Sequence, residues 1–166
     1  MSTTEFNPIK DIQQLIDGEL NAEGEELDLS MAPPFVRGMD LAGLHFTRVA
    51  ASEFDMVWTV DPHLTHYDGV VQGGVVNVIA DTGQSFAYAT TSTVPETFST
   101  AEFTTRFFRP IKSGNVIDVR SRVINRSRRL GVVETRFIER ESSKLCATVT
   151  GAWMVVDRDF GGASSS

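Results

Sequence analysis

The sequence has a single cysteine, Cys146, among its 166 residues. One cysteine can form no internal disulfide and no metal site by itself, so we expect stability from packing alone and a reducing compartment. No apolar run reaches the roughly 18 residues that a membrane helix needs. The first residues, MSTTEFNPIKDIQQLIDGEL, also lack the basic start and apolar stretch of a signal peptide. We therefore expect a cytoplasmic protein with no membrane association.

Basic residues are in the minority, with 15 Lys and Arg against 22 Asp and Glu and a formal charge of −7. A nucleic-acid-binding protein needs a surplus of positive charge on one face, so we expect no nucleic-acid partner. One cluster is positively charged although the chain as a whole is negative: Arg120, Arg122, Arg126, Arg128 and Arg129. It could bind an anion such as a nucleotide phosphate, but a solvated, arginine-rich hairpin end is the interpretation that we favour.

The length and an ordinary composition predict one domain with additional ends. We expect an N-terminal extension at residues 1–35, a main domain at residues 36–158 and a disordered tail at residues 159–166. Apolar residues at helical spacing indicate a short helix in the extension: Ile9, Ile12, Leu15, Ile16 and Leu20. Pro33 and Pro34 should stop any helix, and Phe35 with Val36 should return the chain to the body of the domain.

The sequence of the main domain predicts two strands, then one helix, then four further strands. Residues 44–60 carry two strand-like runs, and four further β-rich segments are separated by turn residues: 98–109, 115–125, 129–140 and 145–156. Residues 73–90 have almost no consistently polar face, as expected of a helix enclosed by other structure. Trp58, Trp153 and Cys146 read as residues of the core or of an interface. The pattern predicts an α+β fold, with one antiparallel sheet curled around one long apolar helix.

Gly73 and Gly74 lie where the apolar helix should begin. The free N–H groups of its first turn would then be unobstructed, and with the helix dipole they could bind a carbonyl oxygen that becomes an oxyanion. Paired glycines can also serve only a tight turn or close packing. Both interpretations predict that the helix starts here.

Asp81 lies inside this apolar helix, where an ionised carboxylate is costly unless it has partners or a catalytic purpose. The alternative is a side chain that turns to solvent or caps a neighbouring turn. Eight residues separate Gly73 from Asp81, about 12 Å along a helix, which is too far for both to act on one carbonyl carbon. If both act on one substrate, Asp81 must come from a second subunit, as a two-fold dimer allows.

Three segments resemble the acyl-CoA thioesterases of the phenylacetate-degradation (PaaI-like) type within the hotdog superfamily: PPF at 33–35, DGVVQGGVVNVIADTG at 68–83 and FFRPIKSG at 107–114. The resemblance implies a hotdog fold, a homodimer that often pairs into a homotetramer, a CoA thioester as substrate, and neither cofactor nor metal. By resemblance, Asp81 is the general base or nucleophile and the Gly73 amide binds the oxyanion. Thr100 falls near a hydroxyl residue that assists the attacking water in that family, although it could merely pack.

Two positions depart from the family pattern. The usual HGG reads Gln72-Gly73-Gly74, and an asparagine common six positions before that histidine is His66. Backbone amides would still form the oxyanion site, but substrate orientation and water placement are open. Gln72 cannot carry a proton near neutral pH, whereas His66 can. His66 could therefore replace the missing histidine, or it could only close a polar loop.

Acyl-CoA hydrolysis is the function that these residues favour. A hotdog dehydratase or hydratase would need a histidine paired with an acid, which His66 and Asp68 imitate only weakly. A non-catalytic protein that binds acyl-CoA or an aromatic ligand is a third possibility, because Gln72 replaces the usual histidine. His63 and His66 near Asp61 could suggest a metal site, but the segment has no further clustered ligand, so we expect none.

Overall fold

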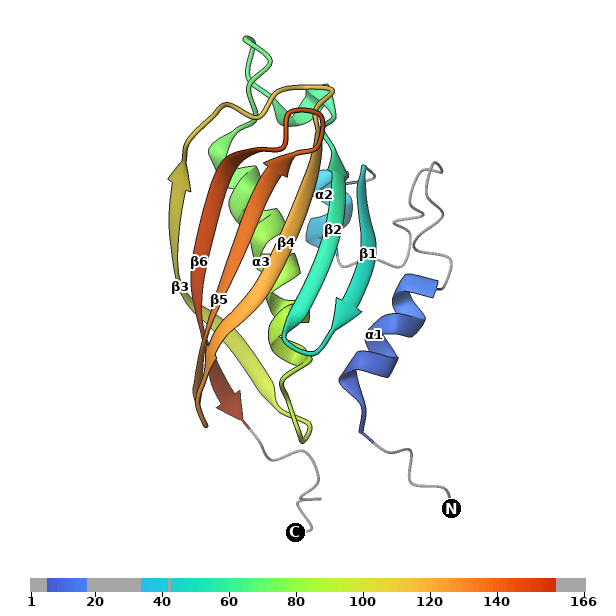
Figure 1. The fold of residues 1–166 in the computed structure, drawn as a ribbon, viewed down its shortest axis with the longest axis vertical. Helices are drawn as coiled ribbons and strands as arrows, with labels where there is room; N and C mark the ends of the chain where they lie inside the picture. Colours follow the sequence, from blue (N-terminus) through green and yellow to red (C-terminus); the bar gives the residue numbers. More distant parts are fainter. Residues whose placement is uncertain (1–5, 18–33, 42, 158–166) are drawn as a thin grey trace.

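Six antiparallel strands form one curved sheet in the computed structural model, which describes residues 6–17, 34–41 and 43–157 (Figure 1). The spatial order is β1-β2-β4-β5-β6-β3, so β1 and β3 are the two edge strands. The strands are β1 Leu44–Ala50, β2 Glu53–Thr59, β3 Thr97–Phe107, β4 Val116–Arg126, β5 Leu130–Glu139 and β6 Lys144–Asp157. The two strands predicted at residues 44–60 and the four predicted after residue 97 are confirmed.

Alternation along the strands explains why they cover a core. In β2, Phe54, Met56 and Trp58 are buried while the residues between them are only partly buried. This period of two places every second side chain on the inner face of the sheet. The turn before β4 contains Gly114 at φ 80°, a left-handed conformation that favours glycine.

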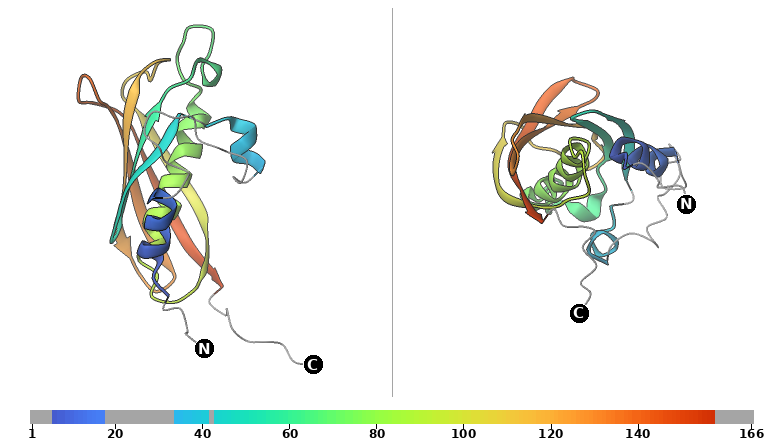
Figure 2. Two further views of the ribbon diagram at one scale, coloured as in Figure 1. Left: turned by 90° about the vertical axis from the view of Figure 1, so that its right-hand side faces the viewer. Right: turned by 90° about the horizontal axis from the view of Figure 1, so that it is seen from below.

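Helix α3 (Gly73–Ala89) lies in the concave face of the sheet, which curls around it when viewed along the helix (Figure 2). Ile79, Ala80 and Ala87 are fully buried, so the predicted enclosed helix and the α+β architecture are confirmed. Gly83 permits close contact with β4, because a Cβ there would lie 2.5 Å from the Ser121 Oγ. No helix in the described part of the chain is long and apolar enough to cross a membrane.

A buried glutamine joins α3 to β6. The Gln84 side chain is fully buried; its Nε2 donates to the Val149 carbonyl at 2.9 Å, and its Oε1 accepts from the Trp153 Nε1 at 2.9 Å. Gly151 lies between these two β6 residues, and a Cβ there would come within 2.1 Å of the Gln84 Oε1. A buried amide with satisfied hydrogen bonds fixes the position of α3 on the sheet more specifically than apolar packing alone.

Helix α1 (Pro8–Asp17) lies beside β1 at the edge of the sheet (Figures 1 and 2). Ile12 is buried in the same core as the sheet residues, and Ile9 and Ile16 pack against it, but Leu15 is 41% exposed. The apolar face of α1 is therefore narrower than the sequence indicated. Leu20, Pro33 and the tail at residues 159–166 lie outside the described residues, and the division at residue 35 stays a prediction.

Pro34 begins the short helix α2 (Pro34–Met39), which the sequence analysis did not predict. Proline fits the first turn of a helix because its fixed φ is compatible and its missing N–H has no partner there in any case. The Phe35 side chain is 55% exposed, so it does not pack in the core, whereas Val36, expected to return the chain to the domain together with Phe35, is partly buried.

Candidate functional site

Helix α3 begins at Gly73, as the sequence indicated. Gln72 is the N-cap residue, with φ −60° and ψ 125°, and its side chain makes no capping hydrogen bond. Gly73 and Gly74 form the start of the first turn, where N–H groups have no preceding helical carbonyl to bind. No Cβ covers them, and the helix dipole adds partial positive charge at this end. This end of the helix can therefore accept a carbonyl oxygen or an anion.

A pocket of about 380 Å³ opens beside Gly73. Its lining is largely apolar: Val70, Val71, Gly73, Val76, Phe107, Phe108, Arg109, Pro110 and Ile111. The Phe107 ring lies 3.3 Å from where a Cβ of residue 73 would be, so a glycine lets the ring sit close to the start of the helix. Phe107 and Phe108 are 55% and 53% exposed, respectively, which leaves apolar surface at the pocket available to a ligand.

Asp81 lies two turns further along α3, is partly buried and faces β3. The Thr100 Oγ1 donates a 2.7 Å hydrogen bond to the Asp81 Oδ1. Among the described residues, no other group hydrogen-bonds the carboxylate, so Oδ2 is available to water or to a ligand. The structure thus brings Asp81 and Thr100 together, and the continuous helix keeps Asp81 about 12 Å from Gly73 in the same chain.

The sequence analysis missed a second polar pair between α3 and β3. The Thr105 Oγ1 donates to the Asn77 Oδ1 at 2.5 Å, and both residues are partly buried. Asn77 precedes Asp81 by four residues and so lies on the same face of the helix. A polar side chain one helical turn before Asp81, in an otherwise apolar helix, was the signal that could have revealed it.

His66 and Gln72 lie in the segment that leads into α3. The His66 side chain is exposed, in a turn closed by backbone hydrogen bonds from the His66 N to the Val70 O at 2.8 Å and from the Gly69 N to the His66 O at 2.9 Å. Gln72 is exposed directly before Gly73. The geometry thus places Gln72 beside the first-turn amides and His66 in a surface turn, and the roles of both residues stay predictions.

His63 joins the short 3-10 helix η2 (Pro62–Leu64) to α2. Its Nδ1 lies 2.6 Å from the Asp61 Oδ1, and its Nε2 lies 3.1 Å from the Met39 carbonyl oxygen. The Asp61 hydrogen bond raises the pKa of His63, with a further contribution from the Met39 carbonyl. Among the described residues, no group of three or more His, Cys, Asp or Glu is arranged to hold a metal ion.

The raised pKa of His63 predicts stability that falls as pH rises. The protonated ring is favoured in the folded state, so its contribution is complete below the unfolded pKa of about 6.5 and is lost as pH rises through the higher folded pKa. The effect should be small, because the side chain is 41% exposed and solvent screens the pair. Urea denaturation at several pH values measures it. His63→Gln should abolish the decline, and an unchanged decline would contradict the assignment.

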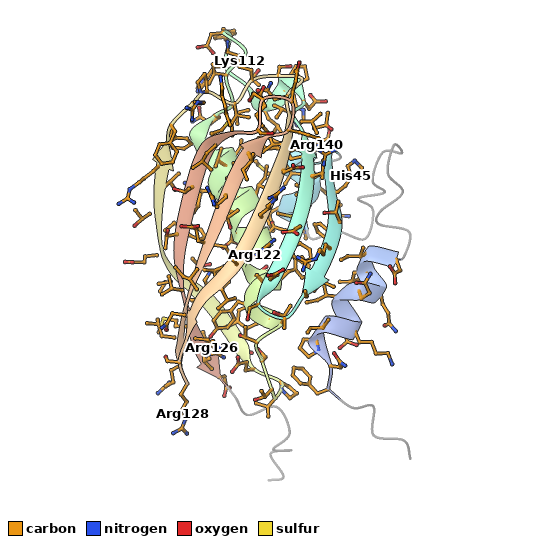
Figure 3. All side chains as sticks on the ribbon, viewed as in Figure 1. His45, Lys112, Arg122, Arg126, Arg128 and Arg140 are labelled. Atoms are coloured by element: carbon orange, nitrogen blue, oxygen red, sulfur yellow. The ribbon has the colours of Figure 1, made fainter. Side chains whose placement is uncertain are left out.

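Most of the arginine cluster is paired within the chain. Arg120 forms an ion pair with Asp118, Arg122 with Asp55, and Arg126 with Glu96. Figure 3 shows Arg126 and Arg128 at the end of the sheet opposite Lys112. Lys112 lies at the end where α3 begins, through its β-bridge with Val70. Arg126 and Arg128 are therefore remote from the Gly73 pocket, and three of the five arginines of the cluster form ion pairs with carboxylates.

Comparison with known proteins shows the fold and a partial match to one family model. Residues 68–146, just under half of the chain, match the family model of the thioesterase superfamily. A phenylacetic acid degradation-related protein of Ralstonia eutropha JMP134 is 25% identical with a TM-score of 0.67, covering 86% of this chain and 98% of that one. PaaI of E. coli, from the phenylacetic acid degradation operon, is 15% identical with a TM-score of 0.67, over 78% of this chain and 89% of that one.

A third similar structure is a Streptococcus mutans UA159 protein bound to acetyl CoA, at 14% identity and a TM-score of 0.65, covering 70% of this chain and 91% of that one. Comparison with curated protein sequences gave no match. The resemblance recognised in the sequence is thus confirmed. The chain has the hotdog fold, its residues 68–146 match the thioesterase-superfamily model, and its structure is similar to those of PaaI-like proteins.

Proposed function

We propose that this chain hydrolyses an acyl-CoA thioester to a carboxylic acid and free CoA. The observation that carries the proposal is Asp81, a partly buried carboxylate that Thr100 holds by a 2.7 Å hydrogen bond on the helix that begins with Gly73. A carboxylate with one free oxygen and a set of unobstructed amides are the two groups that acyl transfer to water requires. The match of residues 68–146 to the thioesterase-superfamily model supports the same chemistry.

In the proposed reaction, the thioester carbonyl oxygen accepts a hydrogen bond from the Gly73 N–H, with that of Gly74 as a second donor. Asp81 either removes a proton from a water that attacks the carbonyl carbon, or attacks that carbon itself to give a mixed anhydride that water hydrolyses after the thiol has left. Negative charge gathers on the oxygen beside the amides, the C–S bond then breaks, and CoA leaves as the thiol after protonation. The reaction consumes one water and requires no cofactor.

The separation of about 12 Å between Gly73 and Asp81 requires two copies of the chain for one reaction centre. In a two-fold dimer, Gly73 of one copy would face Asp81 of the other, and the symmetry would create two equal centres. The apolar pocket beside Gly73 suits an apolar acyl group, and Arg109 and Lys112 at the same end offer positive charge to CoA phosphates. The S. mutans structure with acetyl CoA supports a CoA ligand.

Release of free thiol from short-chain, long-chain and aromatic acyl-CoAs tests the proposal. We expect the full chain to release CoA from at least one of these classes. Binding of the acyl-CoAs without thiol release would instead assign a ligand-binding function. Hydration of an enoyl-CoA without thiol release would assign a hydratase.

Thr100→Val should lower kcat by about tenfold, because it removes a hydrogen bond to a charged group worth roughly 1.5 kcal/mol or more. The loss should appear in kcat rather than in KM, because the Thr100 hydroxyl contacts the Asp81 carboxylate. Thr100→Ser keeps the hydroxyl and should behave like the native protein. The control is Thr104→Val, on the exposed face of the same strand. Equal kcat values for Thr100→Val and the native protein would remove Thr100 from the site.

A further inference from the structure

Asn77 lies on α3 midway between Gly73 and Asp81. It follows Gly73 by four residues and precedes Asp81 by four, so it is the midpoint between the two groups of the proposed centre. Its Oδ1 accepts a hydrogen bond from Thr105 on the edge strand β3. Asp81 faces the same strand, where its carboxylate accepts a hydrogen bond from Thr100. Among the described residues, no acceptor binds the Asn77 Nδ2, so its two N–H donors are available.

The midpoint between Gly73 and Asp81 is the position of the two-fold axis in a dimer. This dimer rests on the proposed function. If Gly73 of one copy faces Asp81 of the other, a two-fold axis requires the reverse pair as well, and the two helices run in opposite directions past each other. Along each helix, Gly73 then lies about 6 Å on one side of the axis and Asp81 about 6 Å on the other. The residue at the level of the axis is Asn77.

We propose that Asn77 meets Asn77 of a second copy across the two-fold axis, with Thr105 supporting each of them, and that this polar contact sets the register of the two helices. An amide is suited to this role because it donates and accepts at once, so each Nδ2 can donate to the other copy's Oδ1. That oxygen has two lone pairs, and Thr105 uses only one of them. Polar side chains in otherwise apolar helix contacts are known to fix register in this way.

The contact has a consequence for the reaction centre. A slip of the helices by one turn would move Gly73 of one copy about 5.4 Å from its place opposite Asp81. Such a slip would also separate the two Asn77 amides, and each would lose the other as its hydrogen-bond partner. Asn77 is thus a positioning residue, which acts on the centre only through the alignment of the two copies.

Cross-linking tests the position directly. In Asn77→Cys, the two new thiols should lie close enough across the axis for a short bismaleimide to link the copies into a covalent dimer. The matched control is Ser85→Cys, four residues beyond Asp81 and also partly buried, whose two thiols would lie about 24 Å apart along the helix direction. Native Cys146 is buried, so the native protein serves as the blank. Linking at residue 85, or at neither residue while sedimentation shows a dimer, would overturn the inference.

A charge placed at the axis provides a second, independent measurement. Asn77→Asp should raise the dimer dissociation constant at least tenfold at neutral pH, because two carboxylates would then face each other, and acidification should restore dimerisation. Ser85→Asp adds the same charge away from the axis and should leave the dissociation constant nearly unchanged. Equal effects of the two variants would contradict the proposed contact.

The outcomes separate this inference from the proposed function. Linking at residue 77 in a protein that hydrolyses no acyl-CoA would support the axis contact and reject the thioesterase. Thiol release by a native dimer that links only at another residue would support the thioesterase and reject the axis contact.

Discussion

Asp81→Asn is expected to reduce kcat for thioester hydrolysis by about 10³-fold, within the range for loss of a general base. Asparagine has nearly the same shape and can still bond Thr100 through its side-chain oxygen, so the fold and acyl-CoA binding should survive. It cannot accept a proton from water at neutral pH, and it is a poor nucleophile. The effect should therefore appear in kcat, with little change in KM.

The rate of thiol release from the acyl-CoA that the native protein hydrolyses fastest measures this loss of kcat. Asp11→Asn is the matched control, because it makes the same chemical change at an exposed position of helix α1 and should leave kcat unchanged. Circular dichroism and the unfolding midpoint of each variant establish that the fold is retained. Native activity in a folded Asp81→Asn protein would remove the carboxylate from the mechanism.

Gly151→Ala is expected to lower the free energy of unfolding by about 3 kcal/mol, at the upper end of typical overpacking effects. The new Cβ would lie 2.1 Å from the Gln84 Oε1 and 2.7 Å from a carbon of the Phe103 ring. Gln84 cannot move away cheaply, because its amide satisfies the buried Val149 carbonyl and the Trp153 N–H. The methyl group must therefore shift α3 relative to β6 or break these hydrogen bonds.

Urea denaturation of the native protein and the variant gives this difference in free energy. Gly38→Ala is the matched control, since a Cβ there meets no atom within 4 Å and the residue lies in helix α2. It should be neutral or stabilising by up to about 1 kcal/mol, as alanine is favoured over glycine in helices. Similar unfolding curves for Gly151→Ala and the native protein would mean that the contact around Gln84 relaxes without cost.

Sequence periodicity was sufficient to predict most of the fold. The strands alternate with a period of two and α3 has almost no polar face, so local pattern and tertiary burial agree in these elements. Helix α2 was not predicted, because proline both ends helices and begins them, and the residue type alone does not distinguish the two roles. The exposure of Leu15 could not be predicted, because helical spacing indicates an apolar stripe but not how much of it another element covers.

The candidate site could be predicted only where a residue conflicts with its surroundings. Asp81 stood out as an acid in an apolar helix, and the glycine pair marked where that helix begins. The Asn77–Thr105 and Gln84–Trp153 hydrogen bonds join residues 28 and 69 positions apart. Such pairs depend on how α3 is set against β3 and β6, which local pattern does not determine. The catalytic roles of all these residues remain predictions.

Helix α1 also limits how copies of the chain can assemble. A sheet whose two outer strands both have free backbone groups can add further chains on either side and grow into a fibre. In the described part of the chain, α1 lies against β1, whereas no helix lies beside the outer margin of β3 (Figure 1). Within the described residues, the β3 margin is thus the one that no helix covers. A chain with one covered and one open margin should form a finite pair at most, rather than an open-ended polymer.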